Sequence, residues 1–485
     1  MSLTRRDFSK ILGASAIASV ASPLMLNSSF AMSNPKNNNP EIKRGIYLIK
    51  NAAIITVDPH IGTLPMADII IRNGIIDRIG KNLSDVDAEI IDATNMIVMP
   101  GFVNAHYHMW SAIGRSFTAK KEGFSYYPAK FATSALYTPD DFYNSVMLAS
   151  AELVNGGTTT VHNWSHNTRS PEHADAELRA HQESFMRARY SYGHVDRLAA
   201  DKINPYNDID RVQRQWFGIN DKFEGMVHLG LNLRGTLQSD EATFYKEMEY
   251  AKKVRLPVAI HAPQEGPNSA DAVEYEKRQY LGPDFLIAHY ISARDEDLAA
   301  MARTKTPITI ATHSELRLSS TGDARAVIMK MRESGLCISL SSDATSIAPP
   351  DMFEMMRFTW NLGVPWTHTP SANFSPIGIP EVIKMATLNG AIALGLGEIT
   401  GSISEGKRAD IIMIRADDLN IAPVSDIETA VVQSATSNNV DTVFIDGKII
   451  KRSGRLIAYN ETSIIAKAQS SAKRIHAAAG DLLEP

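Results

Sequence analysis

The sequence has little cysteine, no excess of basic charge and few long apolar runs, and each shortage excludes a class of protein. Cys337 is the single cysteine among 485 residues, which excludes an intrachain disulfide and a cysteine-rich zinc site. The 49 Lys and Arg residues against 54 Asp and Glu residues give a formal net charge of −5, which disfavours nucleic acid as the main partner. After the N-terminal segment no run is long and apolar enough to cross a bilayer, so no membrane partner is expected.

The first 31 residues form a targeting pattern that does not belong to the fold. Arg5 and Arg6 are a twin arginine, a moderately apolar stretch runs from Ile11 to Leu26, and Ala31 ends a small-x-small cleavage site. This is typical of a bacterial twin-arginine export signal, which is an address read by a receptor. A short N-terminal membrane helix is the alternative, but the stretch is interrupted and short for a span. The mature protein is therefore expected in the periplasm or outside the cell.

The segment Pro100–His108 carries the strongest chemical signal. The apolar run Met96–Met99 predicts a short buried strand, and the segment that continues it ends in His106 and His108. Residues i and i+2 of an extended chain point to the same face, so both imidazoles can reach one point just past the strand. Two converging imidazoles indicate a transition-metal site. Two unrelated histidines at a strand end are the alternative.

Two β-rich blocks near the chain ends flank a long middle that alternates strands and helices. Neither block is long enough for a core of its own, so one small domain from both ends is favoured over two separate β units. Repeated β-then-α order predicts a parallel sheet of the α/β class, and eight strands predict a closed (β/α)8 barrel. A doubly wound open sheet is the alternative, but no Gly-rich phosphate loop follows any strand. After the first strand, further strands are expected at Thr158–Asn163, Ala188–His194, Gly225–Arg234, Pro257–His261, Phe285–Ile291, Ile308–His313 and Cys337–Asp343.

The barrel prediction can be combined with the positions of the polar residues. Chemistry in such a barrel belongs at the C-terminal ends of the strands. The residues that end the expected strands are His106, His108, His162, His194, His261, His289, His313 and Asp343. A single histidine of this kind is more often a core residue, but so many at one end of a barrel indicate a functional site with some bystanders.

These residues carry a resemblance to the amidohydrolase superfamily, in particular to enzymes of the cytosine deaminase, chlorohydrolase and S-adenosylhomocysteine deaminase type. The resemblance runs from about residue 45 to 455 and rests on Pro100–His108, Ala386–Ala391 and Gly401–Asp410. It implies a barrel beside a small β-sandwich built from both chain ends. The expected organisation is a signal peptide (1–31), a linker (32–44), an N-terminal β-sandwich segment (45–95), the barrel (96–397), a C-terminal β-sandwich segment (398–456) and a C-terminal helix (457–485).

The resemblance implies that His106, His108, His261 and Asp343 hold one divalent metal, with His289 near the metal-bound water. No lysine ends the expected fourth or fifth strand, where two-metal members carry a bridging modified lysine, so a mononuclear site is expected. Three imidazoles and a carboxylate suit zinc and would accept iron or manganese. Such a metal lowers the pKa of its water. Asp343 is then the expected general base, and His289 would stabilise the developing oxyanion.

One position departs from the pattern of the ring deaminases. Those relatives usually carry His-x-x-Glu after strand 5, and the Glu protonates a ring nitrogen. Here Gln264 takes that position and Glu265 follows it. Either Glu265 reaches the site through a shifted loop, or ring protonation is not needed.

The sequence therefore predicts a metal-dependent hydrolase that cleaves a C–N bond in an amide-like or N-heterocyclic small molecule. A deaminase that releases ammonia is the closest alternative, a dehalogenating hydrolase is another, and a non-catalytic metal-dependent binding protein belongs to a different class. Further candidates for substrate contact are Gln264, His162, His313 and Trp110. The substrate stays open because one fold hosts many chemistries, and a homo-oligomer is also left open because relatives often form dimers and tetramers.

Overall fold

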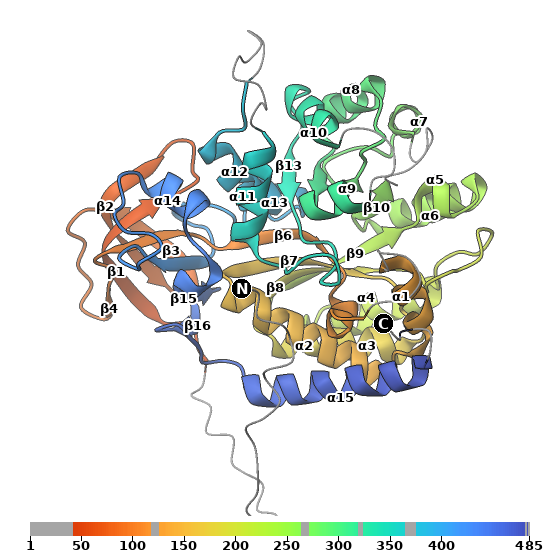
Figure 1. Cartoon of the computed structure of the whole chain (residues 1–485), viewed down its shortest axis with the longest axis horizontal. Coiled ribbons are helices and arrows are strands. Elements are labelled where there is room, and N and C mark those ends of the chain that lie inside the picture. Colours follow the sequence, from red (N-terminus) through yellow and green to blue (C-terminus); the bar gives the residue numbers. More distant parts are fainter. Residues whose placement is uncertain are drawn as a thin grey trace, which may run out of the picture. The chain divides into compact units, whose positions relative to one another are not determined.

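The computed structural model describes residues 42–117, 126–262, 271–318, 324–363, 375–480 and 483 (Figure 1). The expected export signal at 1–31 and most of the expected linker at 32–44 lie outside the described residues. Within the described ranges, none of the helices combines the length and apolarity that a membrane span requires.

Eight strands that follow one another in the chain form a parallel sheet in sequence order. They are β6 (Phe102–Tyr107), β7 (Thr158–Ser165), β8 (Arg187–Tyr192), β9 (Val227–Leu233), β10 (Val258–Ala262), β11 (Phe285–His289), β12 (Ile308–Ile310) and β13 (Ile338–Leu340). A parallel bridge between Tyr107 and Asp343 joins the two ends of the sheet. The (β/α)8 barrel is therefore confirmed, and the open doubly wound sheet is wrong.

Helices connect the strands and cover the barrel, as Figure 1 shows. The main connecting helices are α2 (Pro139–Asn155), α3 (Pro171–Glu183), α4 (Tyr206–Trp216), α6 (Glu241–Val254), α7 (Ala272–Lys277), α8 (Asp295–Thr304), α10 (Ala324–Glu333) and α11 (Met352–Leu362). Shorter ones are α1 (Tyr126–Thr133), α5 (Gly235–Gln238), α9 (Thr312–Leu318), α12 (Ile379–Met385), α13 (Leu388–Ala393), α14 (Ile427–Gln433), η1 (Met109–Gly114), η2 (Ser134–Leu136) and η3 (Ser437–Asn439). The last helix, α15 (Glu461–Ala479), packs on α2, where Asn144 donates to the Ser471 hydroxyl at 3.1 Å.

A second sheet is built from both ends of the described chain. Its nine strands are β1 (Ile46–Ile55), β2 (Thr63–Arg72), β3 (Ile75–Gly80), β4 (Glu89–Asp92), β5 (Met96–Pro100), β14 (Ile411–Arg415), β15 (Val440–Ile445), β16 (Lys448–Arg452) and β17 (Arg455–Leu456). Strand β5 pairs with both β1 and β14, so it joins the two chain ends into one continuous sheet. The prediction of one small domain is confirmed, and the alternative of two separate β units is wrong.

The prediction that the apolar run Met96–Met99 begins the first barrel strand is wrong. That run forms β5 of the small sheet, and the chain crosses at Gly101 into the barrel strand β6. A Cβ atom at Gly101 would lie 2.2 Å from the Thr159 methyl carbon, so only glycine fits this crossing. Apolar content alone could not separate the two strands, because both are buried.

Five barrel strands end earlier than expected. Strands β9 and β11 end one and two residues early, and β8 ends at Tyr192, so His194 follows that strand instead of ending it. The last two strands end three residues early. Strand β12 ends at Ile310, and His313 lies in α9 rather than at a strand end. The Glu315 carboxylate accepts hydrogen bonds from the Ala311 N–H at 3.0 Å, which turns the chain into the helix. Strand β13 ends at Leu340, so Asp343 follows the strand by three residues.

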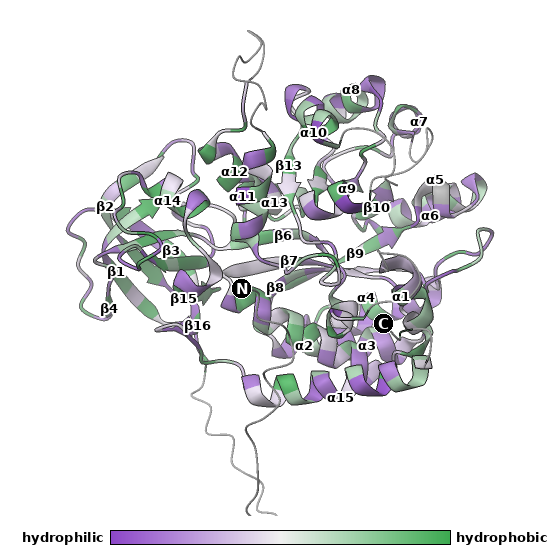
Figure 2. Ribbon diagram, in the orientation of Figure 1, coloured by the Kyte–Doolittle hydropathy of each residue, from purple (hydrophilic) through white to green (hydrophobic). Residues whose placement is uncertain are grey.

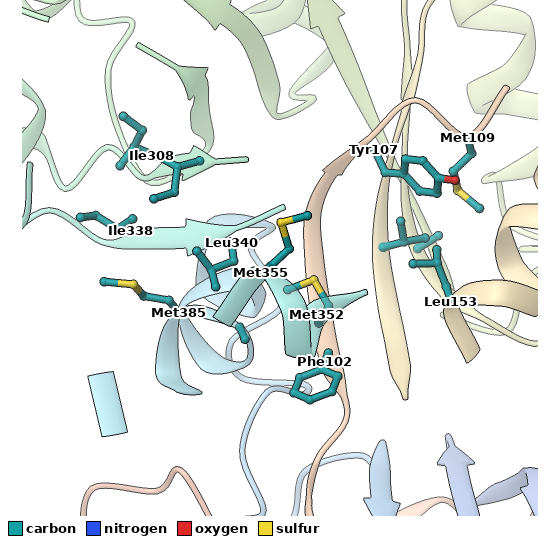
Figure 3. Packing of buried hydrophobic residues seen from close by; sticks show 14 of the residues in the cluster. Phe102, Tyr107, Met109, Leu153, Ile308, Ile338, Leu340, Met352, Met355 and Met385 are labelled. Atoms are coloured by element: carbon teal, nitrogen blue, oxygen red, sulfur yellow. The ribbon is translucent and has the colours of Figure 1, made fainter. Parts of the chain in front are cut away.

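Methionine-rich helices cover the barrel near its closing strands. In Figure 3, Met352 lies beside Phe102, and Leu340 lies close to Met355. Phe102 also meets the Phe353 ring edge-on, with the centroids 4.8 Å apart. Burying side chains of this size stabilises the fold by about 1.5 to 3 kcal/mol each, so this layer holds β6 and β13 in place. Hydrophilic and hydrophobic segments alternate along α2 and α15 (Figure 2), as expected of helices with one protein-facing side.

A buried ion-pair network ties β8 to the small sheet. The Arg187 guanidinium on β8 donates through Nε to Asp410 at 2.7 Å, and its Nη2 lies 3.7 Å from Asp446. Asp410 also accepts from the Asp446 backbone N–H at 2.7 Å, while Arg44 and Arg408 pair with Asp446 from the rim. Each of the two carboxylates therefore has at least one arginine partner, and Arg187 itself is almost completely buried.

We predict that Arg187→Met lowers the free energy of unfolding by about 3 to 5 kcal/mol, because it leaves the buried Asp410 carboxylate without a counter-charge. The measurement is a denaturant unfolding curve, with the exposed Arg214→Met variant on α4 as the matched control. A change in Arg187→Met no larger than in the control would show that the network does not hold the two sheets together.

Candidate metal centre and active site

The closure of the barrel brings the first and last strands of the site together. The Asp343 N–H donates to the His106 carbonyl at 3.0 Å, and the His108 N–H donates to the Asp343 carbonyl at 2.8 Å. Beside them, Asn104 donates to the Ser342 hydroxyl at 2.6 Å. Three residues of the sequence motif are thus bonded to the segment that carries Asp343, two through backbone groups and Asn104 through its side chain.

The side chains of this cluster converge on one point. Asp343 Oδ1 lies 3.3 Å from His106 Nε2 and 3.1 Å from His108 Nε2. His261 Nε2, at the end of β10, lies 3.3 Å from His106 Nε2. His106, His261, His289 and Asp343 each offer a ligand atom within 4.8 Å of the others.

The chemistry of the donor set fits a bound divalent metal. Four ligands at about 2.0 to 2.1 Å around a tetrahedral ion lie about 3.3 Å from one another. The three separations of 3.1 to 3.3 Å that link His108 to Asp343, Asp343 to His106 and His106 to His261 agree with that. Burial lowers the pKa of His106 to about 4 and holds the pKa values of His108 and His261 well below the ordinary value. These imidazoles are therefore neutral at pH 7, as metal ligands must be.

Asp343 differs from the imidazoles in its charge. Burial by itself would raise the pKa of this carboxyl, but hydrogen bonds from His106 and His108 and the charge of His289 hold it well below its usual range. Its backbone has a φ of +57°, a left-handed conformation that costs free energy in a non-glycine residue. An anionic oxygen is thereby fixed against three imidazoles.

His289 at the end of β11 is held by a buried carboxylate. Its Nδ1 donates to Glu315 Oε1 at 3.0 Å, which leaves Nε2 at 4.0 Å from Asp343 Oδ1. Burial by itself would lower the pKa of His289, but the carboxylates of Glu315 and Asp343 raise it to about 9. The ring is therefore a cation that can donate a hydrogen bond at the edge of the cluster.

A cavity of about 530 Å³ opens above this cluster at the C-terminal ends of the strands. His108, His261, His289 and Asp343 belong to its lining. Other lining residues include Tyr126, Trp164, His166, Asp196 and Arg197. Trp164 packs on His261 with the ring centroids 4.0 Å apart. The volume is in the usual range for a small-molecule site.

The structure places the weaker sequence candidates outside the lining of this cavity. His162 donates through Nδ1 to the Ala105 carbonyl at 3.0 Å, and its Nε2 lies 2.9 Å from the Ser191 hydroxyl, so its polar atoms are used within the barrel. His313 pairs with Glu354 at 3.1 Å on α9. Trp110 does not line the cavity itself, but its Nε1 donates to Nδ1 of the lining residue His166 at 3.1 Å. Gln264 and Glu265 lie outside the described residues.

Some residues of the site were missed in the sequence. Glu315 follows strand 7 and was expected only as a possible pocket-lining residue, so its contact with His289, 26 residues away, was not predicted. Asn104 stands within the motif, yet nothing in its spacing indicated a bond to Ser342, which is 238 residues away. Asp196 could not be predicted from the periodic pattern of a strand or helix, because it lies in an irregular loop.

The sequence is similar to known proteins along most of its length. Residues 97–450 match the model of the amidohydrolase family. The chain is 27% identical to a 5'-deoxyadenosine deaminase of Methanosarcina barkeri, over 88% of this chain and 98% of that protein. It is 29% identical to a 5-methylthioadenosine/S-adenosylhomocysteine deaminase of Acetivibrio thermocellus, over 88% of this chain and 99% of that protein.

Solved structures share the fold. An adenosine deaminase of Xanthomonas campestris with bound zinc superposes with a TM-score of 0.75 at 19% identity, over 90% of this chain and 99% of that one. The atrazine chlorohydrolase of Arthrobacter aurescens in complex with zinc gives a TM-score of 0.74 at 20% identity, over 88% and 100% of the two chains. The family model covers well over half of the sequence, and the chain belongs to the amidohydrolase family.

Proposed function

We propose that this chain is a metal-dependent hydrolase that cleaves a C–N bond in an N-heterocyclic small molecule and releases ammonia. The observation that carries the proposal is the convergence of His106, His108, His261 and Asp343 at the floor of a small-molecule cavity, with His289 beside them. The named relatives deaminate adenosine-like compounds, which favours an amino group as the leaving group. Cleavage of an amide-like C–N bond is the broader form of the same proposal.

The same four ligands would hold one divalent metal, and their three imidazoles and one carboxylate favour zinc, with iron or manganese as alternatives. When bound, the metal supplies a Lewis acid and lowers the pKa of water. The zinc named in two structural neighbours supports this choice.

The protein's own groups supply the proton transfers. The Asp343 carboxylate, anionic at neutral pH, takes the proton of the attacking water as general base and returns it to the leaving nitrogen. The His289 cation, fixed by Glu315 at 3.0 Å, donates through Nε2 to the oxygen of the attacking water or, with an amide-like substrate, to the carbonyl oxygen on which negative charge develops. Trp164 and Tyr126 line the cavity and offer aromatic faces to a planar ring.

Location and assembly stay predictions. The twin arginine at Arg5 and Arg6 supports export to the periplasm or beyond. A homo-oligomer is consistent with the family resemblance.

The first prediction concerns the metal. Elemental analysis of residues 32–485, purified without added metal, should find about one zinc per chain, and His106→Ala or His261→Ala should remove most of it, because each deletes one of four ligands. His313→Ala, a histidine on α9 outside the cluster, is the matched control and should keep the metal. Two metals per chain, or none even after incubation with zinc, would contradict the site.

The second prediction concerns catalysis. With 5'-deoxyadenosine as probe, Asp343→Asn should lower kcat for ammonia release by about 10²- to 10⁴-fold, and His289→Gln by about 10²- to 10³-fold. Metal content should be measured on each variant, so that lost metal is not taken for lost proton transfer. The exposed Asp295→Asn variant on α8 should match the wild type. A fully metal-loaded Asp343→Asn enzyme with unchanged turnover would sink the proton-transfer scheme.

The third prediction concerns the acid that a ring deaminase needs. Gln264 has no acidic proton to transfer, so Glu265→Ala should lower kcat by about 10²- to 10⁴-fold while Gln264→Ala has a small effect. Steady-state ammonia release by both variants tests this. If neither variant slows turnover, neither residue supplies an acid, and a C–N bond that needs no ring protonation becomes the better proposal.

A further inference from the structure

A second polar cluster lies in the cavity wall, away from the metal ligands. Asp196, in the loop after β8, has its Oδ1 3.2 Å from Lys130 Nζ on α1 and 3.3 Å from His166 Nε2. Both partners lie near the same oxygen. The Asp196 side chain is only 5% exposed. Its Oδ2 atom is buried and has no hydrogen-bond partner among the described residues. A buried acceptor of this kind is rare unless something binds it.

The cluster is held in place from behind. Trp110 Nε1 donates to His166 Nδ1 at 3.1 Å, which puts the proton of a neutral His166 on Nε2, the atom nearest Asp196. The Arg234 guanidinium donates to the Leu198 carbonyl at 3.1 Å and to the Ala199 carbonyl at 2.9 Å. These bonds fix the loop on the C-terminal side of Asp196, so the carboxylate is preorganised rather than mobile.

The charges around the cluster limit which chemical groups of a ligand can bind to it. Lys130 balances the Asp196 carboxylate, and Arg197 adds a further cation to the same wall, stacked over Phe131 at 4.3 Å. A cationic ligand group would meet Lys130 and Arg197, and an anionic one would meet Asp196. A hydroxyl group can donate to a carboxylate oxygen and accept from an ammonium group at the same time. Neutral hydroxyls therefore suit this wall best.

We propose that Asp196, supported by Lys130 and His166, is a specificity subsite that binds hydroxyl groups on a substituent of the heterocycle. The enzyme then prefers a hydroxylated, sugar-like substrate to an equivalent ring without hydroxyls. This inference rests on the proposed function for its reaction, but the binding it describes can be measured separately.

The test compares two probes that differ only in hydroxyls, 5'-deoxyadenosine and 2',3',5'-trideoxyadenosine, on the metal-loaded enzyme. Asp196→Ala should lower kcat/KM for 5'-deoxyadenosine by about 10- to 100-fold, the range expected for hydrogen bonds to a charged acceptor. It should change kcat/KM for the hydroxyl-free probe by less than about 3-fold. Asp201→Ala, in the same loop but with a side chain 63% exposed, is the matched control and should alter neither value.

Folding and chemistry are controlled separately. If Asp196→Ala unfolds because Lys130 is left unpaired, the double variant Lys130→Met/Asp196→Leu removes both charges and should show the same selective loss.

Dissociation constants for both probes, measured with the Asp343→Asn enzyme and with Asp343→Asn/Asp196→Ala, give a readout without turnover. Tighter binding of 5'-deoxyadenosine that depends on Asp196 supports the subsite even if no ammonia is ever released, in which case the proposed function alone fails. Equal losses on both probes, equal affinity for both, or no binding of either overturns the subsite.

Discussion

Two backbone hydrogen bonds at the seam of the barrel position the rest of the site. The Asp343 N–H bonds to the His106 carbonyl at 3.0 Å, and the His108 N–H bonds back to the Asp343 carbonyl at 2.8 Å. This pairing closes the eight-stranded sheet. It also places the Asp343 carboxylate beside the imidazoles of His106 and His108. Nearby, the Asn104 side chain donates to the Ser342 hydroxyl at 2.6 Å, which adds a side-chain hydrogen bond between the same two segments.

The three motifs that carry the family resemblance meet around the strand that holds this seam. The Gly101 N–H donates to the Asp410 carbonyl, and the Val103 N–H donates to the Ala386 carbonyl, each at 2.9 Å. A Cβ atom at Gly390 would lie 2.8 Å from the Val103 Cβ, so a glycine is needed where α13 approaches β6. Two of the motifs, far apart in the chain, thus contact the strand segment that the first motif forms.

Electrostatics then gives each polar residue a distinct charge. Burial keeps the ligand imidazoles neutral, whereas the Glu315 carboxylate keeps His289 cationic with a pKa of about 9. Identical side chains a few ångströms apart are thus given different charges by their neighbours, neutral as a metal ligand must be or cationic as a proton donor must be. At the cavity wall, Lys130 and His166 hold Asp196 in the same manner, through contacts at 3.2 and 3.3 Å.

The sequence by itself determined the barrel and the small domain from both chain ends, because strand periodicity and strand ends are local patterns with a known meaning in this fold. The same patterns placed eight polar residues near strand ends, and the family resemblance implied that His106, His108, His261, His289 and Asp343 among them form one site. The sequence pattern misassigned Met96–Met99 to the barrel, since a buried run does not reveal its sheet. Only the tertiary structure decided that Glu315 orients His289, that His162 and His313 face other partners, and that Asp196 meets Lys130 across the cavity. Those contacts join loops and helices distant in sequence, and no local pattern encodes which side chains such segments bring together.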